Sequence, residues 1–237
     1  MSLQISRKSF LKKSASAFAF SAVAFPNVIL PKQKEKLGVA LVGLGRYSSG
    51  LLAPGLQQTG HCELKGIVTG TPSKIPEWQE KYGIPDSNVY NYKNMYQIAD
   101  NDDIDVIYIV VPPGLHAVYA ITAAEAGKHV WCEKPMAMNV QECEAIISAA
   151  RKNKVQLTIG YRMQHEPNTQ TIIRYGREET YGPVRRVETG AGYNGAHHDP
   201  DNWRRIADMG GGALYDMGVY PINGARCRKG TTVVRTE

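Results

Sequence analysis

The sequence predicts an α/β fold: a doubly wound parallel (Rossmann) sheet followed by the start of a truncated α+β domain. From residue 37 to residue 160, short apolar segments alternate with segments of helical spacing, the pattern of parallel strands joined by helical crossovers. Residues 104–111 are almost continuously apolar, as a parallel strand covered on both faces must be. Gly43 and Gly45 interrupt the chain between the first strand and the first helix.

Apolar runs bounded by glycine, proline or polar residues predict six strands, at 39–42, 62–68, 89–90, 104–111, 129–132 and 155–159. Apolar residues at helical spacing predict helices between them, at 49–58, 75–82, 92–99, 115–126 and 140–151. Beyond Arg162 this alternation stops. We expect a helix at 167–175, a strand of another sheet at 184–193, a helix after Gly212 and a short strand at 231–234.

The turn after the first strand has the composition of a pyrophosphate site. Gly43 permits a tight turn, and Gly45 lacks the Cβ that would block an approaching phosphate. A helix beginning near Ser48 would direct its free N–H groups and positive dipole end at the same point. Ser48 stands where the usual motif has its third glycine, so the motif alone is also compatible with an ordinary loop. With the alternating strands, it predicts a dinucleotide-binding domain at 37–160.

The end of the second strand bears on the choice of dinucleotide. A fold that prefers NAD normally has an acidic residue there to bind the ribose 2′-hydroxyl, and residues 69–74 contain none. Thr69 offers a hydroxyl, and Lys74 could reach a 2′-phosphate. These residues favour NADP, or tolerance of both dinucleotides. The alternative for Lys74 is a surface lysine at the start of a helix.

Residues that could perform chemistry follow the fifth strand and occupy a later helix. Lys134 ends the fifth strand, and Asp216 and Tyr220 are four residues apart, which places them on one helical face. Hydride transfer from an alcohol needs a base for the hydroxyl proton and a cation for the developing alkoxide, which Tyr220 and Lys134 could supply. A nearby lysine would lower the pKa of the tyrosine, and Asp216 could orient either group. Each feature alone is also compatible with a polar turn or a solvated helix face.

Composition limits the remaining possibilities. Four basic residues in 1–24 account for most of the net charge of +6, leaving +2 on the rest of the chain, which does not suggest nucleic-acid binding. The four cysteines have no metal-site or disulfide spacing and are interpreted as small buried apolar residues. His197, His198, Asp199 and Asp201 form one polar loop without a second ligand group, so we predict substrate contacts there and no metal. His116, near a helix start, is interpreted as a solvated or capping residue.

Residues 1–36 are interpreted as an export signal and linker. A basic segment with Arg7 and Lys8 precedes a short apolar stretch, residues 15–24, that ends in Ala-Val-Ala. This resembles a twin-arginine signal with lysine in place of the second arginine, and it predicts a periplasmic protein. The apolar stretch is too short to span a membrane. We therefore expect no membrane association beyond the signal.

Five motifs of the sequence together carry a family resemblance. They are Gly-Leu-Gly-Arg-Tyr (43–47), Pro-Pro-Gly-Leu-His (112–116), Gly-Lys-His-Val-Trp-Cys-Glu-Lys-Pro-Met-Ala (127–137), Ile-Gly-Tyr-Arg (159–162) and Gly-Gly-Gly-Ala-Leu-Tyr-Asp-Met-Gly-Val-Tyr (210–220). With these motifs the chain resembles the glucose–fructose oxidoreductase / inositol dehydrogenase (Gfo/Idh/MocA) family, most of all its glucose–fructose oxidoreductase branch, which is periplasmic and holds NADP tightly.

The resemblance implies that Lys134, Asp216 and Tyr220 are the catalytic group, with Tyr220 as acid/base, where the inositol dehydrogenase branch has histidine. It also implies that the nucleotide is contacted by Gly43, Leu44, Gly45, Arg46, Tyr47, Thr69, Lys74, Tyr92, Val110, Val111, Pro112, Pro113, Gly114, Leu115, Glu133, Lys134, Arg162 and Arg204. Members of the family continue into a large open sheet that walls the substrate site and forms the oligomer interface. Residues 161–237 are therefore expected to be a truncated substrate and catalytic domain, and a homo-oligomer is expected only with the complete domain.

Three functional hypotheses follow. The first is an NADP-dependent oxidoreductase, with NAD possible, that transfers a hydride at a carbinol carbon of a sugar or polyol. The second is a nicotinamide-dependent glycosidase, in which transient oxidation precedes elimination. The third is a fragment that binds NADP(H) without turnover.

Overall fold

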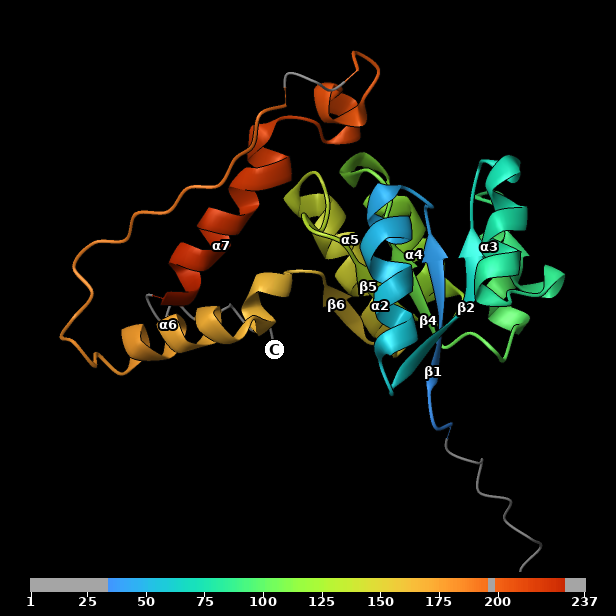
Figure 1. Ribbon diagram of the computed structural model, residues 1–237, viewed down its shortest axis with the longest axis horizontal. Helices are drawn as coiled ribbons and strands as arrows, with labels where there is room; N and C mark the ends of the chain where they lie inside the picture. Colours follow the sequence, from blue (N-terminus) through green and yellow to red (C-terminus); the bar gives the residue numbers. More distant parts are fainter. Residues whose placement is uncertain (1–33, 196–198, 229–237) are drawn as a thin grey trace, which may run out of the picture. The chain divides into compact units, whose positions relative to one another are not determined.

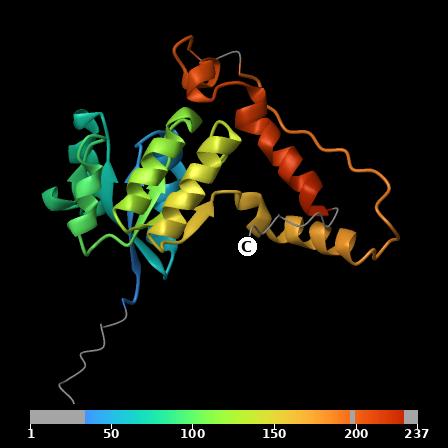
Figure 2. The ribbon, with the colours of Figure 1, turned by 180° about the vertical axis from the view of Figure 1, so that it is seen from behind.

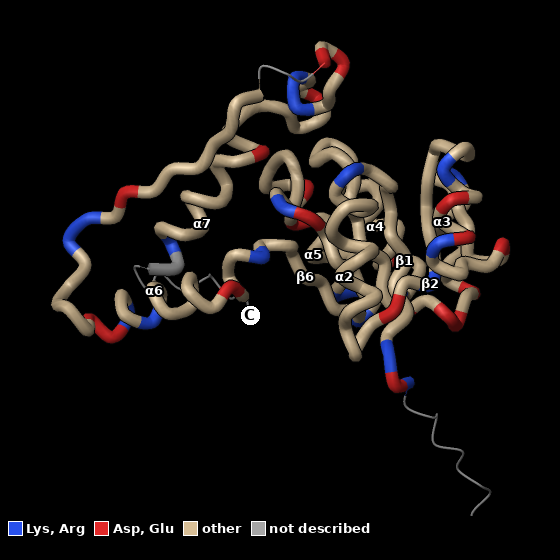
Figure 3. Tube along the Cα trace, in the orientation of Figure 1, with Lys and Arg blue, Asp and Glu red and all other residues tan. Residues whose placement is uncertain are grey.

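The computed structural model describes residues 34–195 and 199–228 (Figure 1). The expected export signal, the strand at 231–234, and His197 and His198 lie outside the described residues. Along the described chain, basic residues are interspersed with acidic ones (Figure 3). Among the described helices, none has the length and apolar character needed to cross a membrane.

A six-stranded parallel sheet forms the first part of the described chain, which confirms the predicted Rossmann fold. Its strand order is β3-β2-β1-β4-β5-β6. The chain therefore builds the sheet outward from β1 in one direction and then outward from β4 in the other. Ligands of such sheets bind at this switch point, outside the carboxyl ends of the strands. The strands are β1 (Leu37–Val42), β2 (Cys62–Val68), β3 (Val89–Tyr90), β4 (Val106–Ile109), β5 (His129–Cys132) and β6 (Leu157–Ile159).

Helices cover both faces of the sheet, and alternate side chains of β1 enter two separate cores. Val39 and Leu41 pack with Trp78 of α3 (Ile75–Tyr82) and with residues of α2 (Ala53–Gln58). Ala40 and Val42 pack in the cluster formed with α4 (His116–Glu125) and α5 (Val140–Lys152). Figure 2, seen from behind, shows α4 and α5 in front of the sheet. The continuously apolar strands of the sequence result from this burial on both faces.

Some predicted elements differ in extent or type. Residues 92–99 were expected to form a regular helix, but the structure has a 3₁₀ segment, η5 (Met95–Asp100), after a turn in which the Asn91 side chain accepts hydrogen bonds from the amides of Lys93 and Asn94. Such side-chain-to-backbone bonds compete with helix formation. Strand β4 is shorter than the predicted 104–111, although Val110 N still donates to Val42 O at 2.8 Å.

The later residues form helices and irregular segments. The helix α6 (Pro167–Arg177) is capped by Glu166, whose carboxylate accepts hydrogen bonds from the amides of Asn168 and Thr169. The strand predicted at 184–193 is wrong, because this segment pairs with no other strand of the described chain. An extended segment becomes a strand only when a neighbour takes its backbone hydrogen bonds. After three 3₁₀ or π-helical segments, η8 (Trp203–Arg205), η9 (Ala207–Met209) and η10 (Leu214–Gly218), the described chain ends in α7 (Val219–Arg228).

Candidate active site

The glycine turn lies at the carboxyl end of β1, where β1 adjoins β4. Gly43 has φ +95°, and a Cβ there would lie 2.6 Å from Val110 O, so only glycine fits this close approach of two strand ends. A Cβ on Gly45 would meet nothing within 4 Å, which leaves open space for a phosphate in front of the turn. Ser48, which replaces the third glycine, is buried and donates to Gly43 O at 2.5 Å. The buried Ser48 hydroxyl thus stabilises the turn through its hydrogen bond to Gly43 O. Ser48 also begins the π-helical segment η2 (Ser48–Leu52), which leads into α2.

Lys74 lies next to the glycine turn. Its Nζ donates to Leu44 O at 2.7 Å, although thirty residues separate the two in sequence. The Leu44 side chain is buried, so its contribution to this site is its main chain. Thr69 is also buried, and its hydroxyl oxygen accepts from Thr71 N at 3.0 Å. The cation predicted to meet a 2′-phosphate therefore lies at the turn, and the Thr69 hydroxyl oxygen accepts a hydrogen bond within its own loop.

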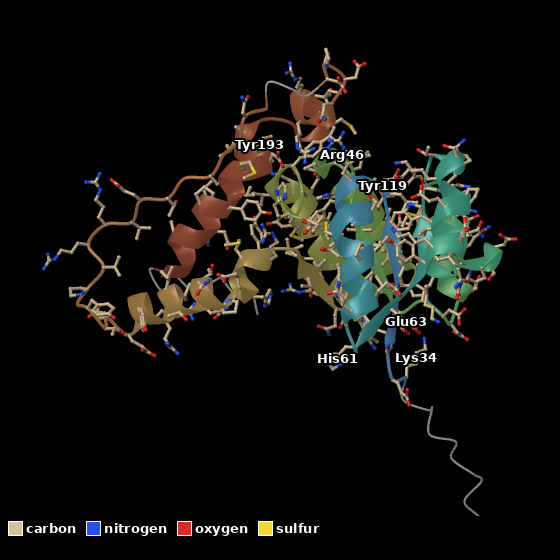
Figure 4. All side chains as sticks on the ribbon, in the orientation of Figure 1. Lys34, Arg46, His61, Glu63, Tyr119 and Tyr193 are labelled. Carbon is tan, nitrogen blue, oxygen red and sulfur yellow. The ribbon has the colours of Figure 1, made fainter. Side chains whose placement is uncertain are left out.

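Aromatic side chains lie near the same end of the sheet. Tyr92 stacks on Tyr119 of α4 with ring centroids 5.0 Å apart. A Cβ on Gly70, at the end of β2, would lie 3.0 Å from the Tyr92 ring. Figure 4 shows Arg46 and Tyr119 near the carboxyl ends of the strands, whereas His61 and Glu63 lie at the opposite end. The predicted nucleotide residues Arg46 and Tyr92 are thus both near the ligand-binding edge.

The turn after β4, predicted to contact the nucleotide through residues 110–115, packs against the later part of the chain. A Cβ on Gly114 would lie 2.3 Å from Asp208 O, and one on Gly210 would lie 2.5 Å from Pro113 Cβ. The Tyr215 hydroxyl donates to Met138 O at 2.7 Å. These contacts hold the segment before α7 against the sheet edge.

His116 is buried at the start of α4, which makes the prediction of a solvated residue wrong. Its Nδ1 lies 2.7 Å from Pro135 O and its Nε2 lies 2.8 Å from Val111 O, so the imidazole bridges the ends of β4 and β5. Burial lowers the pKa of His116, while its contacts with the two carbonyl oxygens act in the opposite direction. Sequence spacing alone contained no signal for this bridge.

Glu133 is buried beneath the site. The Tyr108 hydroxyl donates to Glu133 Oε1 at 2.6 Å, and burial raises the pKa of the Glu133 carboxyl. Glu133, Tyr47 and Arg162 line a cavity of about 260 Å³ on the face of the sheet that carries Tyr108 and Trp131. Three predicted nucleotide residues therefore share one cavity. Tyr108 was not predicted as a site residue, because only the tertiary contact distinguishes it from the rest of an apolar strand.

Lys134, Asp216 and Tyr220 meet, although 82 residues separate Lys134 from Asp216. Lys134 Nζ donates to Asp216 O, lies 3.6 Å from Asp216 Oδ1, and lies 4.6 Å from the centroid of the Tyr220 ring. The side chains of Lys134 and Asp216 are each 11% exposed, so this pairing occurs largely out of water. The π-helical segment η10 contains Asp216 and runs directly into α7, which carries Tyr220.

The expected lowering of the Tyr220 pKa is wrong for this arrangement. Burial and the Glu133 carboxylate raise the pKa of Tyr220, and they outweigh Arg162, which hydrogen-bonds the phenol and lowers it. Lys134 lies over the ring face rather than beside the hydroxyl. Burial also lowers the pKa of Lys134, against the opposing influence of Asp216 and Glu133.

Asp216 has two further partners. Its Oδ2 accepts from Arg204 Nε at 2.9 Å and from the Tyr193 hydroxyl at 2.8 Å. Burial would raise the pKa of Asp216, but Tyr193, Arg204 and Lys134 lower it below its usual range. Arg204 was predicted to contact the nucleotide, and its observed partner is this carboxylate. Tyr193 was not predicted at all, because it belongs to the segment for which the sequence indicated a strand.

Within the described residues, no group of three histidine, cysteine, aspartate or glutamate side chains is arranged to hold a metal ion. Cys132 is buried, whereas Cys62 and Cys143 are partly exposed. The prediction of small buried cysteines therefore holds fully for one of the three that the structure describes.

Comparison with known proteins places this site in context. Residues 37–161 match the family model described as "Oxidoreductase family, NAD-binding Rossmann fold", and residues 169–235 match the model of the GFO/IDH/MocA C-terminal domain. A crystal structure of aldose-aldose oxidoreductase from Caulobacter crescentus, complexed with glycerol, is 41% identical with a TM-score of 0.79. The match covers 82% of this chain and 58% of that one.

More distant relatives are also named as dehydrogenases or reductases. D-xylose 1-dehydrogenase [NADP(+)] from Haloarcula marismortui is 28% identical over 199 residues, which cover 79% of this chain and 52% of the relative. A 3-ketoreductase from Actinomadura kijaniata, solved as a mutant with TDP-benzene and NADP, is 25% identical with a TM-score of 0.67. That match covers 81% of this chain and 57% of the other. The chain thus spans about half the length of the relatives it matches.

Proposed function

Because the chain belongs to the GFO/IDH/MocA family of oxidoreductases, we propose that it transfers a hydride between a nicotinamide dinucleotide and a carbinol carbon of a sugar or polyol. The observation that carries this proposal is the meeting of Lys134, Asp216 and Tyr220 near the ligand-binding edge of the sheet. An ammonium, a carboxylate and a phenol together provide the cation and the proton-transfer group that oxidation of an alcohol needs.

The residues of the glycine turn fit the dinucleotide. Open space in front of Gly45 and the backbone N–H groups of the helical residues 46–47 that follow it would receive the pyrophosphate. When bound, the dinucleotide supplies the hydride acceptor or donor. The cavity lined by Tyr47, Glu133 and Arg162 would receive its reactive ring, because Glu133 and Arg162 lie close enough to Tyr220 to shift the pKa of its phenol.

The chain's own groups would handle the proton and the charge. Lys134 would donate a hydrogen bond to the reacting oxygen and stabilise negative charge on it. In oxidation Tyr220 would act as the phenolate and accept the hydroxyl proton, and in reduction it would act as the phenol and return that proton to the substrate oxygen. The raised pKa of Tyr220 favours the protonated phenol, so the ligand-free site is prepared to act as an acid. Asp216 would keep Lys134 oriented through its main-chain oxygen, which accepts a hydrogen bond from the ammonium.

We propose NADP as the preferred dinucleotide. Lys74 supports this choice, since its ammonium lies at the glycine turn and no acidic residue occupies the end of β2. A cation can pair with a 2′-phosphate, whereas the usual acidic residue would repel it. The names of an NADP-dependent relative and of an NADP complex agree with this preference.

The function is tested with Tyr220→Phe, using Tyr96→Phe as a matched control, because Tyr96 is exposed and lies in η5. The chain is incubated with NADP⁺ and a panel of aldoses and polyols, and NADPH formation is followed by absorbance. We expect Tyr220→Phe to lose turnover by about 10²-fold or more while dinucleotide binding stays within twofold. Equal turnover in both variants would refute the role of Tyr220. Binding without reduction of NADP⁺ across the panel would favour a binding fragment instead.

We also propose that the protein is exported to the periplasm by the twin-arginine route, on the basis of the basic and apolar segments in residues 1–24. Fractionation of cells that produce the chain would test this. Replacing Arg7 and Lys8 by glutamine should leave the protein in the cytoplasm. An unchanged distribution would contradict the proposal.

A further inference from the structure

The carboxylate of Asp216 is divided between two cations. One oxygen, Oδ2, accepts from Arg204 Nε at 2.9 Å and from the Tyr193 hydroxyl at 2.8 Å. The other, Oδ1, lies 3.6 Å from Lys134 Nζ, which is longer than a normal hydrogen bond. Lys134 makes its direct hydrogen bond to the main-chain oxygen of Asp216 instead. The carboxylate is therefore held mainly by Arg204 and Tyr193.

Arg204 is itself well held. Its main-chain N–H donates to Asn202 Oδ1 at 3.1 Å, which starts the η8 turn. Its guanidinium lies 4.3 Å from the centroid of the Trp203 ring, a favourable cation–π distance. The Arg204 side chain is 35% exposed and that of Asp216 is 11% exposed, so the pair lies at the border of the buried site. The Arg204 contact is thus supported by its own turn and does not depend on a bound ligand.

From this division we propose that Arg204 and Tyr193 are positioning residues: they hold the Asp216 carboxylate back from Lys134, so that the Lys134 ammonium keeps a donor for the substrate oxygen. The role of the Lys134 donor toward a substrate oxygen rests on the proposed function. The structural claim, that Arg204 and Tyr193 limit the pairing of Asp216 with Lys134, stands without it. A lysine carries three donors, and a carboxylate released from Arg204 and Tyr193 would bind more of them.

Electrostatics indicate the sign of the effect. Burial is the main reason that the pKa of Lys134 is lowered, and the Arg204 cation acts in the same direction. Loss of Arg204 would remove that repulsion and release Oδ2 to pair with Lys134, and both changes favour the charged amine. The charged or titratable groups that face Lys134 from neighbouring elements are Asp216, Glu133, Arg204, Tyr220 and His116.

The test measures the pKa of Lys134 directly in the full chain without dinucleotide. Amines are acylated in brief pulses across a pH series, and mass spectrometry quantifies modification at Lys134, with surface Lys65 as internal reference. Only the neutral amine reacts, so the midpoint of the rate against pH is the pKa. This midpoint does not depend on how accessible the amine is, whereas a labelling rate measured at a single pH does.

We expect Arg204→Gln to raise the Lys134 midpoint by about one pH unit, equivalent to a tenfold slower reaction below it. Tyr193→Phe should raise it by less, and Arg204→Lys, which keeps the charge, should stay closer to wild type. Arg174→Gln is the matched control, because that guanidinium also lies against the aromatic ring of a neighbouring residue, Tyr175, but belongs to α6. If Arg204→Gln does not fold, Tyr193→Phe decides.

An unchanged or lowered Lys134 midpoint in Arg204→Gln or, failing that, in Tyr193→Phe would overturn the proposal. If the Lys134 midpoints of the variants shift from wild type as expected, but the wild-type chain reduces no NADP⁺, the result counts against the proposed function only. Where turnover is measurable, kcat should fall more than KM rises in Arg204→Gln, since the effect acts on the reacting oxygen rather than on dinucleotide binding.

Discussion

A single carbon added at Gly114 should move Asp216 and Tyr220 away from Lys134. Gly114 belongs to η6 (Pro113–Leu115), after β4, and its Cα faces the main chain of the segment that precedes η10. In Gly114→Ala the new Cβ would lie 2.3 Å from Asp208 O, 3.0 Å from Met209 Cα and 3.2 Å from Asp208 C. All three are main-chain atoms, so no side chain can rotate away to make room.

The magnitude follows from those distances. An ordinary contact of a Cβ begins near 3.4 Å, so the Asp208 segment must move by about 1 Å. Overpacking of this kind costs about 1–3 kcal/mol of stability. The same segment leads to Asp216 and Tyr220, and misplacement of reacting groups by about 1 Å can reduce turnover by about 10²-fold.

The assay combines three measurements on Gly114→Ala and on the control Gly55→Ala, whose Cβ would meet nothing within 4 Å in α2. Urea unfolding should show a loss of about 1–3 kcal/mol for Gly114→Ala and a small gain for the control. Hydrogen exchange should speed up in peptides that cover residues 207–216. Turnover should fall about 10²-fold. Wild-type exchange at 207–216 together with wild-type turnover in Gly114→Ala would refute the reasoning.

Three further changes have defined outcomes. Lys74→Ala should weaken NADPH binding by about tenfold and leave NADH binding almost unchanged, because the proposed partner of the ammonium is the 2′-phosphate, which NADH lacks. Fluorescence titration with both dinucleotides checks this. Equal losses of affinity for NADPH and NADH would contradict the NADP preference. Tyr108→Phe should cost about 1–3 kcal/mol in urea unfolding near neutral pH, since it leaves the buried Glu133 carboxyl without its 2.6 Å donor. A loss below about 0.5 kcal/mol would contradict a stabilising role for this hydrogen bond. The folded pKa of Asp216 is lowered, so its contribution to stability is present above its unfolded pKa, near 4, and is lost as the pH falls through the folded value. Urea midpoints measured from pH 6 down to pH 3 should therefore fall less steeply in Asp216→Asn than in wild type, and parallel curves would argue against the linkage.

Much of the fold could be predicted because it depends on local and periodic features. Parallel strands buried on both faces must be apolar along their length, so residues 104–111 and the other strands were recognisable without coordinates. The same holds for the helix at Val140–Lys152, whose apolar spacing and whose cap, Asn139, are both local. The segment at 184–193 was mistaken for a strand because alternation along the chain does not reveal whether a partner strand exists.

For the site, the sequence by itself determined which residue types stand at the strand ends, namely the glycines of the first turn and the lysine after β5. It also determined that an aspartate and a tyrosine four residues beyond it share one helical face. Only the tertiary structure decided how they pair. It placed Lys134 over the ring of Tyr220 rather than at its hydroxyl, moved Arg204 onto Asp216, and brought in Tyr108, Tyr193 and His116. The physical reason is that strand ends and helix positions follow from local spacing, whereas charge pairing and burial depend on which distant segments pack together.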